Sequence, residues 1–239
     1  MREDDSHTWK RCLAQLGLTI FSERSGPNQR SLSPHQSLNS FTVLLDAKLP
    51  PLIVGITGGS GTIYGVRLLQ VLGQMKIEAH VVMSAAAKET LVLETARKVG
   101  EVESLASIAY RVDDIAAPPS SGSFRTRGMV IVPCSMKTLA GVASGFSDNL
   151  ILRAAEVTLK ERRPLVLVPR ETPLTVIDIQ NMLRAANAGA VILPAIPGFY
   201  ARPRTIEDLV DHLVGKILDT LGIEHNLYHR WTGPNAPRR

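Results

Sequence analysis

From about residue 50 onward, short apolar runs alternate with longer segments in which apolar residues recur every three or four positions. The apolar runs predict β-strands at 52–57, 79–83, 129–133, 165–169 and 190–194. The segments with helical spacing predict α-helices at 60–75, 85–99, 136–144, 148–161, 176–188 and 205–221. Strands that alternate with helices form a parallel sheet covered on both faces, so we expect a three-layer α/β fold.

The ends of the last predicted helix are marked by their residue types. Thr205 is a good N-cap, and Gly222 lies where a left-handed C′ residue ends many helices. Ligands of such folds bind at the carboxyl ends of the strands, which directs attention to the turns that follow each predicted strand.

The first residues differ in character from the rest. Ser, Asn, Gln, Pro and scattered charges dominate, and only 9–21 has a weak helical pattern, which Gly17 interrupts. Acidic residues at the very start count against a secretory signal and against a mitochondrial transit peptide. We expect a poorly ordered extension at 1–49, one catalytic domain at 50–231, a disordered tail at 232–239 and a cytoplasmic location.

Composition narrows the class of protein. The 239 residues are 44% hydrophobic and 21% charged, which is typical of one soluble globular domain. No apolar run reaches the roughly 20 residues that cross a bilayer. The net charge of +5 indicates either a mildly basic surface or anionic ligands. We do not expect nucleic acid as a partner, because no known binding motif is present.

The cysteines and histidines do not form a metal-binding pattern. Cys12 and Cys134 lie far apart and outside any C-x-x-C motif, which suits a reducing cytosol. His225 and His229 are spaced i, i+4, but a surface tail explains them better than a metal site. Cys134 as a nucleophile has no histidine motif to support it.

A glycine turn follows the first predicted strand and opens the first helix, at 58–61. Glycines let the backbone approach a ligand, and a helix N-terminus offers free N–H groups to an anion, although a tight turn without a ligand would look the same. The dinucleotide fingerprint fails, because Tyr64 replaces its third glycine and the second strand ends at Ser84 instead of an acid. Ser84 either contacts a flavin or caps the next helix.

A second turn of similar design, 135–138, follows the third predicted strand. It offers small hydroxyl groups and free N–H groups at the start of a helix. Lys137 in the first turn opposes the helix dipole by a few tenths of a kcal/mol, which a bound anion would offset. An exposed lysine without a ligand is the alternative.

Cations gather in the second half of the chain. Arg153, Lys160 and 162–163 lie on or just after one predicted helix, where solvated side chains would be ordinary. Arg170 and Glu171 are different, since they follow a buried strand between two prolines. Cations that hold a phosphate beside a carboxyl group that exchanges a proton suit the departure of a phosphate leaving group.

Several strings in the right order resemble the UbiX-like flavin prenyltransferases, formerly called phenylacrylic or hydroxyarylic acid decarboxylases. The resemblance covers about 52–231 and rests on Gly-x-Ser-Gly-x-Ile-Tyr-Gly (58–65), Pro-Cys-Ser-Met-Lys-Thr (133–138), Ala-Ser-Gly-x-Ser-Asp-Asn-Leu (143–150), Leu-Lys-Glu-Arg-Arg (159–163) and Val-Pro-Arg-Glu-Thr-Pro-Leu (168–174). Gly59 departs from the family, which usually has alanine there.

The resemblance implies a Rossmann-like, flavodoxin-type fold assembled as a homododecamer. It implies transfer of a dimethylallyl group from dimethylallyl phosphate to N5 of reduced FMN, followed by ring closure at C6, without a metal. The product, prenylated FMN, would serve a UbiD-type decarboxylase in ubiquinone biosynthesis or in aromatic acid decarboxylation. Whether the donor is a monophosphate or a diphosphate stays open.

The resemblance also implies roles for individual residues. FMN would be held by Gly58, Gly59, Ser60, Ser84, Ser135, Met136, Lys137, Thr138 and Arg170. The prenyl phosphate would be held by Arg153, Lys160, Arg170, Tyr200 and Lys216, with Trp231 closing the pocket. Glu171 would be the acid/base, Ser60 would touch the reacting groups, and Lys160 would assist departure of the phosphate.

Four other functions are considered. An NAD-dependent oxidoreductase is disfavoured by Tyr64 and Ser84, and a cysteine decarboxylase by the lack of its Pro-x-Met-Asn segment. A direct aromatic-acid decarboxylase and a non-catalytic FMN-binding subunit remain alternatives, which activity measurements distinguish.

Overall fold

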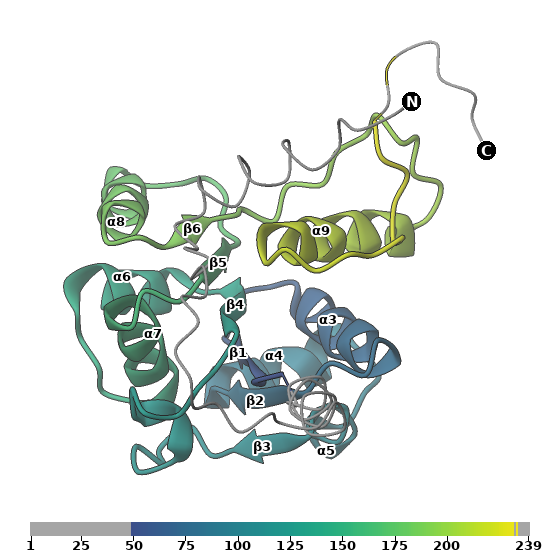
Figure 1. The fold of residues 1–239 in the computed structure, drawn as a ribbon. Coiled ribbons are helices and arrows are strands. Elements are labelled where there is room, and N and C mark those ends of the chain that lie inside the picture. Colours follow the sequence, from purple (N-terminus) through teal and green to yellow (C-terminus); the bar gives the residue numbers. More distant parts are fainter. Residues whose placement is uncertain (1–48, 232, 234–239) are drawn as a thin grey trace, which may run out of the picture. The chain divides into compact units, whose positions relative to one another are not determined.

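A computed structural model describes residues 49–231 and 233 (Figure 1). Its centre is a six-stranded sheet in the order β3-β2-β1-β4-β5-β6, in which every neighbouring pair is parallel. This is the strand order of doubly wound Rossmann sheets, with the switch point between β1 and β4. The strands are β1 (Leu52–Ile56), β2 (Ala79–Met83), β3 (Ile108–Tyr110), β4 (Gly128–Cys134), β5 (Leu165–Pro169) and β6 (Val191–Ile192).

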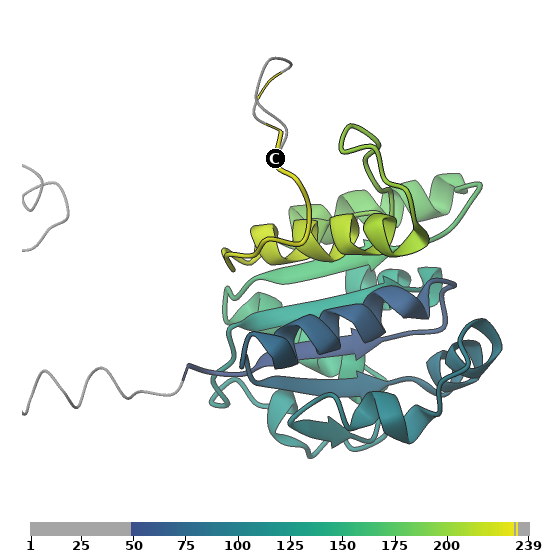
Figure 2. The ribbon, with the colours of Figure 1, turned by 90° about the vertical axis from the view of Figure 1, so that its right-hand side faces the viewer.

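Helices cover both faces of the sheet, because every residue of β1, β2, β4 and β5 is buried and all of them except His80 in β2 are apolar or glycine. The helices are α3 (Thr62–Gln74), α4 (Ala85–Glu94), α5 (Val99–Glu103), α6 (Met136–Ser144), α7 (Leu150–Lys160), α8 (Val176–Asn187) and α9 (Ile206–Thr220), with a 3₁₀ turn η1 at Pro118–Ser120. One core cluster joins the sheet to α3, α4, α5 and α9, and the other joins it to α6, α7 and α8. Figure 2 shows α3 and α9 lying on one face. The predicted three-layer α/β fold is confirmed.

The predicted helix at 85–99 is wrong in its last third. α4 ends at Glu94, and Thr95 takes an extended conformation at φ −131° and ψ 152°. The Thr95 hydroxyl donates to the Leu91 carbonyl and accepts from the Arg97 N–H, so the side chain replaces helical bonds. Strand β3 and η1 were not predicted, because segments of 3 residues are too short to give a pattern; β3 is also an edge strand, in which Ile108 is 42% exposed.

The predicted caps of the last helix are confirmed. The Thr205 hydroxyl accepts from the Asp208 N–H in a capping box, and Gly222 has φ 66°. The predicted extension at 1–49 and tail at 232–239 fall outside the described residues, apart from 49 and 233. Within the described part, no helix is both long and apolar enough to span a membrane.

Candidate functional site

The carboxyl ends of three central strands are tied together by hydrogen bonds. Thr57, which follows β1 and is 1% exposed, donates its hydroxyl proton to the Pro133 carbonyl at 2.8 Å. The same hydroxyl accepts from the Ser135 N–H at 2.7 Å. The Ser84 N–H donates to the Ile56 carbonyl at 3.0 Å. The turns after β1, β2 and β4 therefore meet at one edge of the sheet, as the sequence predicted.

The glycine turn is packed closely against its neighbours. A Cβ added to Gly58 would lie 2.6 Å from the Cβ of Ala86 in α4, so only glycine fits there without a shift. A Cβ added to Gly59 would meet the Cβ of Pro133 at 3.5 Å and the Arg170 carbonyl oxygen at 3.8 Å, which are ordinary contacts. Gly59 therefore borders the start of the segment that carries Arg170 and Glu171.

Two of the three predicted site serines, Ser84 and Ser135, are helix caps. The Ser84 hydroxyl accepts from the Ala87 N–H at 3.1 Å, and the Ser135 hydroxyl accepts from the Thr138 N–H at 3.4 Å. Of the two roles considered for Ser84, the capping role is therefore present. Because a hydroxyl both donates and accepts, capping leaves the Ser84 proton able to reach a ligand.

The Arg170 side chain lies near the first turn of α3. Burial raises the pKa of Tyr64 in that turn, and the positive charge of Arg170 opposes the rise. Glu171 is exposed, and its carboxylate accepts from the Thr172 N–H at 3.2 Å. Lys137 is exposed at the start of α6, whereas Met136 packs against the core.

Glu94, at the end of α4, is a site residue that the sequence did not indicate. Its carboxylate accepts from the Gly61 N–H at 2.9 Å, the Thr62 N–H at 3.0 Å and the Thr62 hydroxyl at 2.9 Å. Partial burial acts to raise the pKa of Glu94, but hydrogen bonds from Ser60, Thr62 and Gly61 together hold it below its ordinary value. A carboxylate of this chain thus occupies part of the helix N-terminus that the glycine turn offered to an anion. No local motif links Glu94 to a turn 33 positions away.

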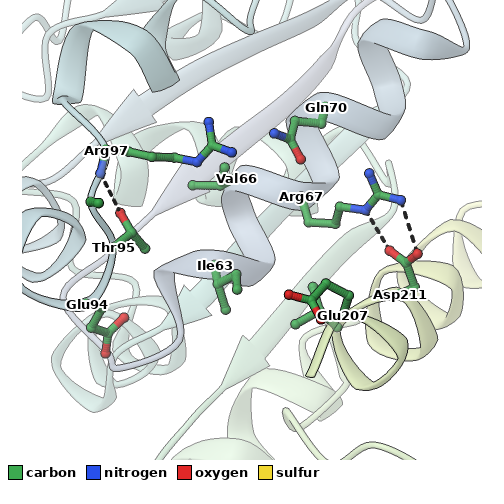
Figure 3. Close-up of a pocket in the computed structure, with 11 residues that line it drawn as sticks. Ile63, Val66, Arg67, Gln70, Glu94, Thr95, Arg97, Glu207 and Asp211 are labelled. Carbon is green, nitrogen blue, oxygen red and sulfur yellow. Dashed lines mark hydrogen bonds and ion pairs between the residues drawn. The ribbon is translucent and has the colours of Figure 1, made fainter. Parts of the chain in front are cut away.

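A pocket of about 670 Å³ opens next to this carboxylate, between α3, the turn after α4 and α9 (Figure 3). Arg67 and Asp211 form a two-point ion pair across it, at 2.6 and 3.0 Å, which links α3 to α9. The residues that line it include none of the predicted site residues. We therefore place the candidate site at the strand ends and not in this pocket.

Lys160 and Arg153 lie in a second region, along α7. Arg153 donates to the Ser120 carbonyl at 3.2 Å and pairs with Glu156 at 2.9 Å, and Lys160 pairs with Glu161 at 2.8 Å. Lys160 ends α7 and precedes the start of β5, whereas Arg170 follows the end of β5. The two cations therefore lie at opposite edges of the sheet, and within one protomer they are not brought together.

The loop that follows η1 closes on this second region. Arg163 donates to the carbonyls of Phe124 and Gly122 at 2.7 and 2.8 Å, and a Cβ added to Gly122 would come within 2.8 Å of the Lys160 ammonium group. Arg163 is accordingly a structural residue that holds the loop, while Lys160 stays half-exposed beside it.

A third region joins the segment after β6 to α9 and the C-terminal segment. The Tyr200 hydroxyl lies 3.3 Å from Nε2 of His212, and the Tyr200 and Trp231 rings are 6.2 Å apart. Lys216 follows His212 by about one turn on α9. Burial lowers the pKa of His212, and charge repulsion from Lys216 lowers it further. The predicted prenyl-phosphate residues Tyr200, Lys216 and Trp231 are thus gathered around one helix.

Asp219 fixes the C-terminal segment to α9. Its carboxylate accepts from the Tyr228 hydroxyl, from Nε2 of His225 at 3.1 Å and from Arg230 at 2.7 Å. Burial acts to raise the pKa of Asp219, but hydrogen bonds from Arg230 and Tyr228 bring it down to about 2. His225 is therefore engaged in a structural network. Among the described residues, no group of three His, Cys, Asp or Glu side chains could hold a metal ion.

Cys134 does not have the properties of a nucleophile. Its side chain is fully buried at the end of β4, and burial raises the pKa of its thiol to about 12. A reactive cysteine needs an accessible thiolate, so the thiol serves as a small core side chain.

Comparison with known proteins identifies the family. Residues 43–218 match the family model described as Flavoprotein. A probable UbiX-like flavin prenyltransferase from Streptomyces sp. is 51% identical over 188 residues, which are 78% of this chain and 94% of the relative. The flavin prenyltransferase LpdB from Lactiplantibacillus plantarum is 54% identical over 183 residues, which are 76% and 98%. The chain belongs to the UbiX-like flavin prenyltransferases.

Solved structures agree with the assignment of this chain to the flavin prenyltransferases. A UbiX protein in complex with FMN and dimethylallyl pyrophosphate has a TM-score of 0.76 and 48% identity, covering 77% of this chain and 98% of that one. A dodecameric FMN-dependent UbiX-like decarboxylase from Escherichia coli has a TM-score of 0.75 and 50% identity, covering 77% and 100%. The peptidyl-cysteine decarboxylase EpiD, at 14% identity and a TM-score of 0.53, shares the fold alone. The predicted family and enzyme class are confirmed.

Proposed function

We propose that this flavin prenyltransferase joins the dimethylallyl group of a dimethylallyl phosphate donor to reduced FMN, giving prenylated FMN and free phosphate. The observation that carries the proposal is identity above 50% to flavin prenyltransferases over nearly their whole length. The site supports it, because the motifs shared with the family fall together at the strand ends.

FMN fits the turns at this edge. Gly58, Gly59 and Ser60 would approach it by their backbone, Ser84 and 135–138 would offer hydroxyl and N–H groups, and Arg170 would add a positive charge. The lack of room for a Cβ at Gly58 shows that this turn packs directly on the start of α4, next to the cap residue Ser84. When bound, the reduced flavin supplies the electron-rich N5 and C6 atoms to which the prenyl group is joined.

The chain's own residues would drive departure of the phosphate. The C–O bond of the donor breaks, the electron pair leaves with the phosphate, and fixed cations stabilise that charge. Glu171 would deliver a proton to the leaving phosphate and take back the proton that N5 loses when it bonds to the prenyl carbon. Ring closure would then add one proton to the prenyl double bond and release the proton of C6, so it consumes no net proton. Ser60 would touch the reacting groups next to Glu171, and its hydroxyl is hydrogen-bonded to the carboxylate of Glu94.

We further propose that Arg153 and Lys160 complete the site of a neighbouring protomer in a homododecamer. The proposal is supported by the place of Lys160 at the opposite edge of the sheet from Arg170 and by the dodecameric relative of known structure. A large apolar surface on α8 also needs cover: Val176 is 70% and Ile177 69% exposed. Assembly would bury this surface and bring cations from one protomer to the strand ends of another.

The finer parts of the function are also proposals. We propose that transfer needs no metal, because the cations of the site can take the charge of the phosphate. A UbiD-type decarboxylase would receive the product. The protein would act in the cytoplasm, whose reducing conditions suit the free thiol of Cys134. Chelation with EDTA should leave the rate unchanged, and both the monophosphate and the diphosphate should be compared as donors.

Variants of two site residues test the proposal. Lys160→Ala and Glu171→Ala should retain reduced FMN but lose prenyl transfer by roughly 10²- to 10⁴-fold. Lys88→Ala is the matched control, since Lys88 is also half-exposed and pairs with a carboxylate at 2.8 Å, as Lys160 does. Normal turnover by both site variants would refute the assignment of these residues. Release of CO₂ from a cinnamate or hydroxybenzoate by the purified protein alone would favour the decarboxylase instead.

A further inference from the structure

His212 on α9 is a buried histidine with a partner at each ring nitrogen. It is 7% exposed, and it lies between the segment after β6 and the C-terminal segment. The Gly198 N–H donates to Nδ1 at 3.2 Å, and Nε2 lies 3.3 Å from the Tyr200 hydroxyl oxygen.

These two contacts fix the direction of the hydrogen bond to Tyr200. A backbone N–H can only donate, so Nδ1 must be the acceptor and the proton of the neutral ring must sit on Nε2. Burial and the charge of Lys216 lower the pKa of His212, which favours that neutral ring. Nε2–H therefore donates to the Tyr200 oxygen.

The consequence concerns the hydroxyl proton of Tyr200. Because the Tyr200 oxygen accepts from His212, its own proton is turned away from the imidazole and toward the exposed side of the ring. Tyr200 is 47% exposed, with Trp231 beside it, and the half-exposed Lys216 lies near the same histidine. A phenol whose proton is directed outward, on the same side of the molecule as a lysine of the next helical turn, suits an anionic oxygen.

The backbone at Gly198 is shaped for this contact. A Cβ at Gly198 would lie 3.1 Å from Nε2 of His212 and 3.0 Å from a ring carbon of Tyr200, so glycine allows the close approach. His212 is too buried to touch a donor molecule itself and acts through its neighbour.

We propose that His212 is a positioning residue, which holds Tyr200 as a hydrogen-bond donor to the phosphate of the dimethylallyl donor. The inference rests on the proposed function, in which Tyr200 contacts that phosphate. It assigns His212 to the affinity for the donor and not to the chemical step.

A matched pair of variants separates this role from simple packing. His212→Gln keeps an oxygen that can accept from Gly198 and an amide that can donate to Tyr200, whereas His212→Met has a similar length and no donor. With reduced FMN saturating, His212→Met should raise the KM for dimethylallyl phosphate roughly three- to tenfold, with kcat changed less than twofold. His212→Gln should restore KM to within about twofold.

The background variant Tyr200→Phe completes a double-mutant cycle. Tyr200→Phe alone should raise KM about as much as His212→Met does, and adding His212→Met to it should cause no further loss. Assembly size and FMN retention are checked for each variant. If His212→Met does not assemble, His212→Phe takes its place in the cycle.

The outcomes separate the two levels of the argument. Wild-type protein that forms no prenylated flavin would refute the proposed function, and this inference with it. Wild-type turnover combined with losses that multiply in the double variant would overturn the inference alone. An unchanged KM in Tyr200→Phe, or a His212→Gln variant as impaired as His212→Met, would also overturn it.

Discussion

Two adjacent glycines offer a sharp test of the site at the strand ends. Both lie in the turn after β1, and neither has a positive φ, so alanine is allowed by the backbone at each. Gly58→Ala would place a Cβ 2.6 Å from the Cβ of Ala86, next to the backbone at the start of α4. Gly59→Ala would meet only ordinary contacts at 3.5 Å and beyond. The neighbour of Gly58 is not the end of a flexible side chain, so either the turn or the first turn of α4 must move.

The two substitutions should have opposite effects: Gly58→Ala is unfavourable and Gly59→Ala is slightly favourable. Overpacking of this kind costs about 1–3 kcal/mol. The turn or the start of α4 must shift to relieve this contact, and restoring the FMN-binding geometry at a cost of about 1–3 kcal/mol corresponds to roughly 5- to 150-fold weaker FMN binding. The same shift would displace Ser84, which caps α4 and is a proposed FMN contact. Gly59→Ala should instead bind FMN normally and gain about 0.4–1 kcal/mol of stability, because alanine restricts the unfolded chain.

The assay is anaerobic titration of each variant with reduced FMN, followed by thermal unfolding at equal protomer concentration. The reasoning predicts weak binding by Gly58→Ala and wild-type binding by Gly59→Ala. Equal affinities in both variants would show that the turn does not approach the flavin as we infer. Loss of binding in Gly59→Ala would show that the space beside Arg170 is needed by the ligand.

Three further predictions follow from other parts of the structure. Glu94→Gln should destabilise the protein by about 0.5–1 kcal/mol, while Glu89→Gln, on the exposed side of the same helix, should not. The pKa of Glu94 is lower in the folded protein than its ordinary value of 4.5. Its contribution to the free energy of unfolding is therefore complete above pH 4.5 and is lost as the pH falls through the folded pKa. The stabilities of wild type and Glu94→Gln should accordingly become equal in acid. Cys134 should resist iodoacetamide in the folded protein at pH 8, and fast alkylation detected by peptide mass would contradict its burial. Asp219→Asn should free the C-terminal segment, seen as several-fold faster tryptic cleavage after Arg230; an unchanged cleavage rate would contradict the clamp.

Local signals in the sequence were enough for the fold. The apolar runs that became β2 and β5 match their observed bounds, because strands buried on both faces are almost continuously apolar; His80 is the one polar residue in these two strands. Thr205 and Gly222 marked the ends of α9 by their own chemistry. The error after Glu94 has the opposite cause: one threonine side chain competes with helical bonds, which periodicity does not register.

The candidate site was predicted in part. Turns that follow neighbouring strands must meet at one edge, so the approach of Gly59 to Pro133 and Arg170 could be anticipated. Long-range contacts could not be anticipated. Glu94 reaches the glycine turn from another helix, and His212 is recognised only when Gly198 and Tyr200 are seen beside it. Lys160 is separated from Arg170 because it ends α7, just before β5 begins, whereas Arg170 follows the end of β5.

The most direct test of the account is anaerobic incubation of the purified protein with reduced FMN and dimethylallyl phosphate, followed by mass analysis of the flavin. We expect FMN to be replaced by a species heavier by one dimethylallyl unit, with release of one phosphate for each flavin converted. FMN that returns with unchanged mass, while the donor stays intact, would contradict the central claim that this chain is an enzyme of flavin prenylation.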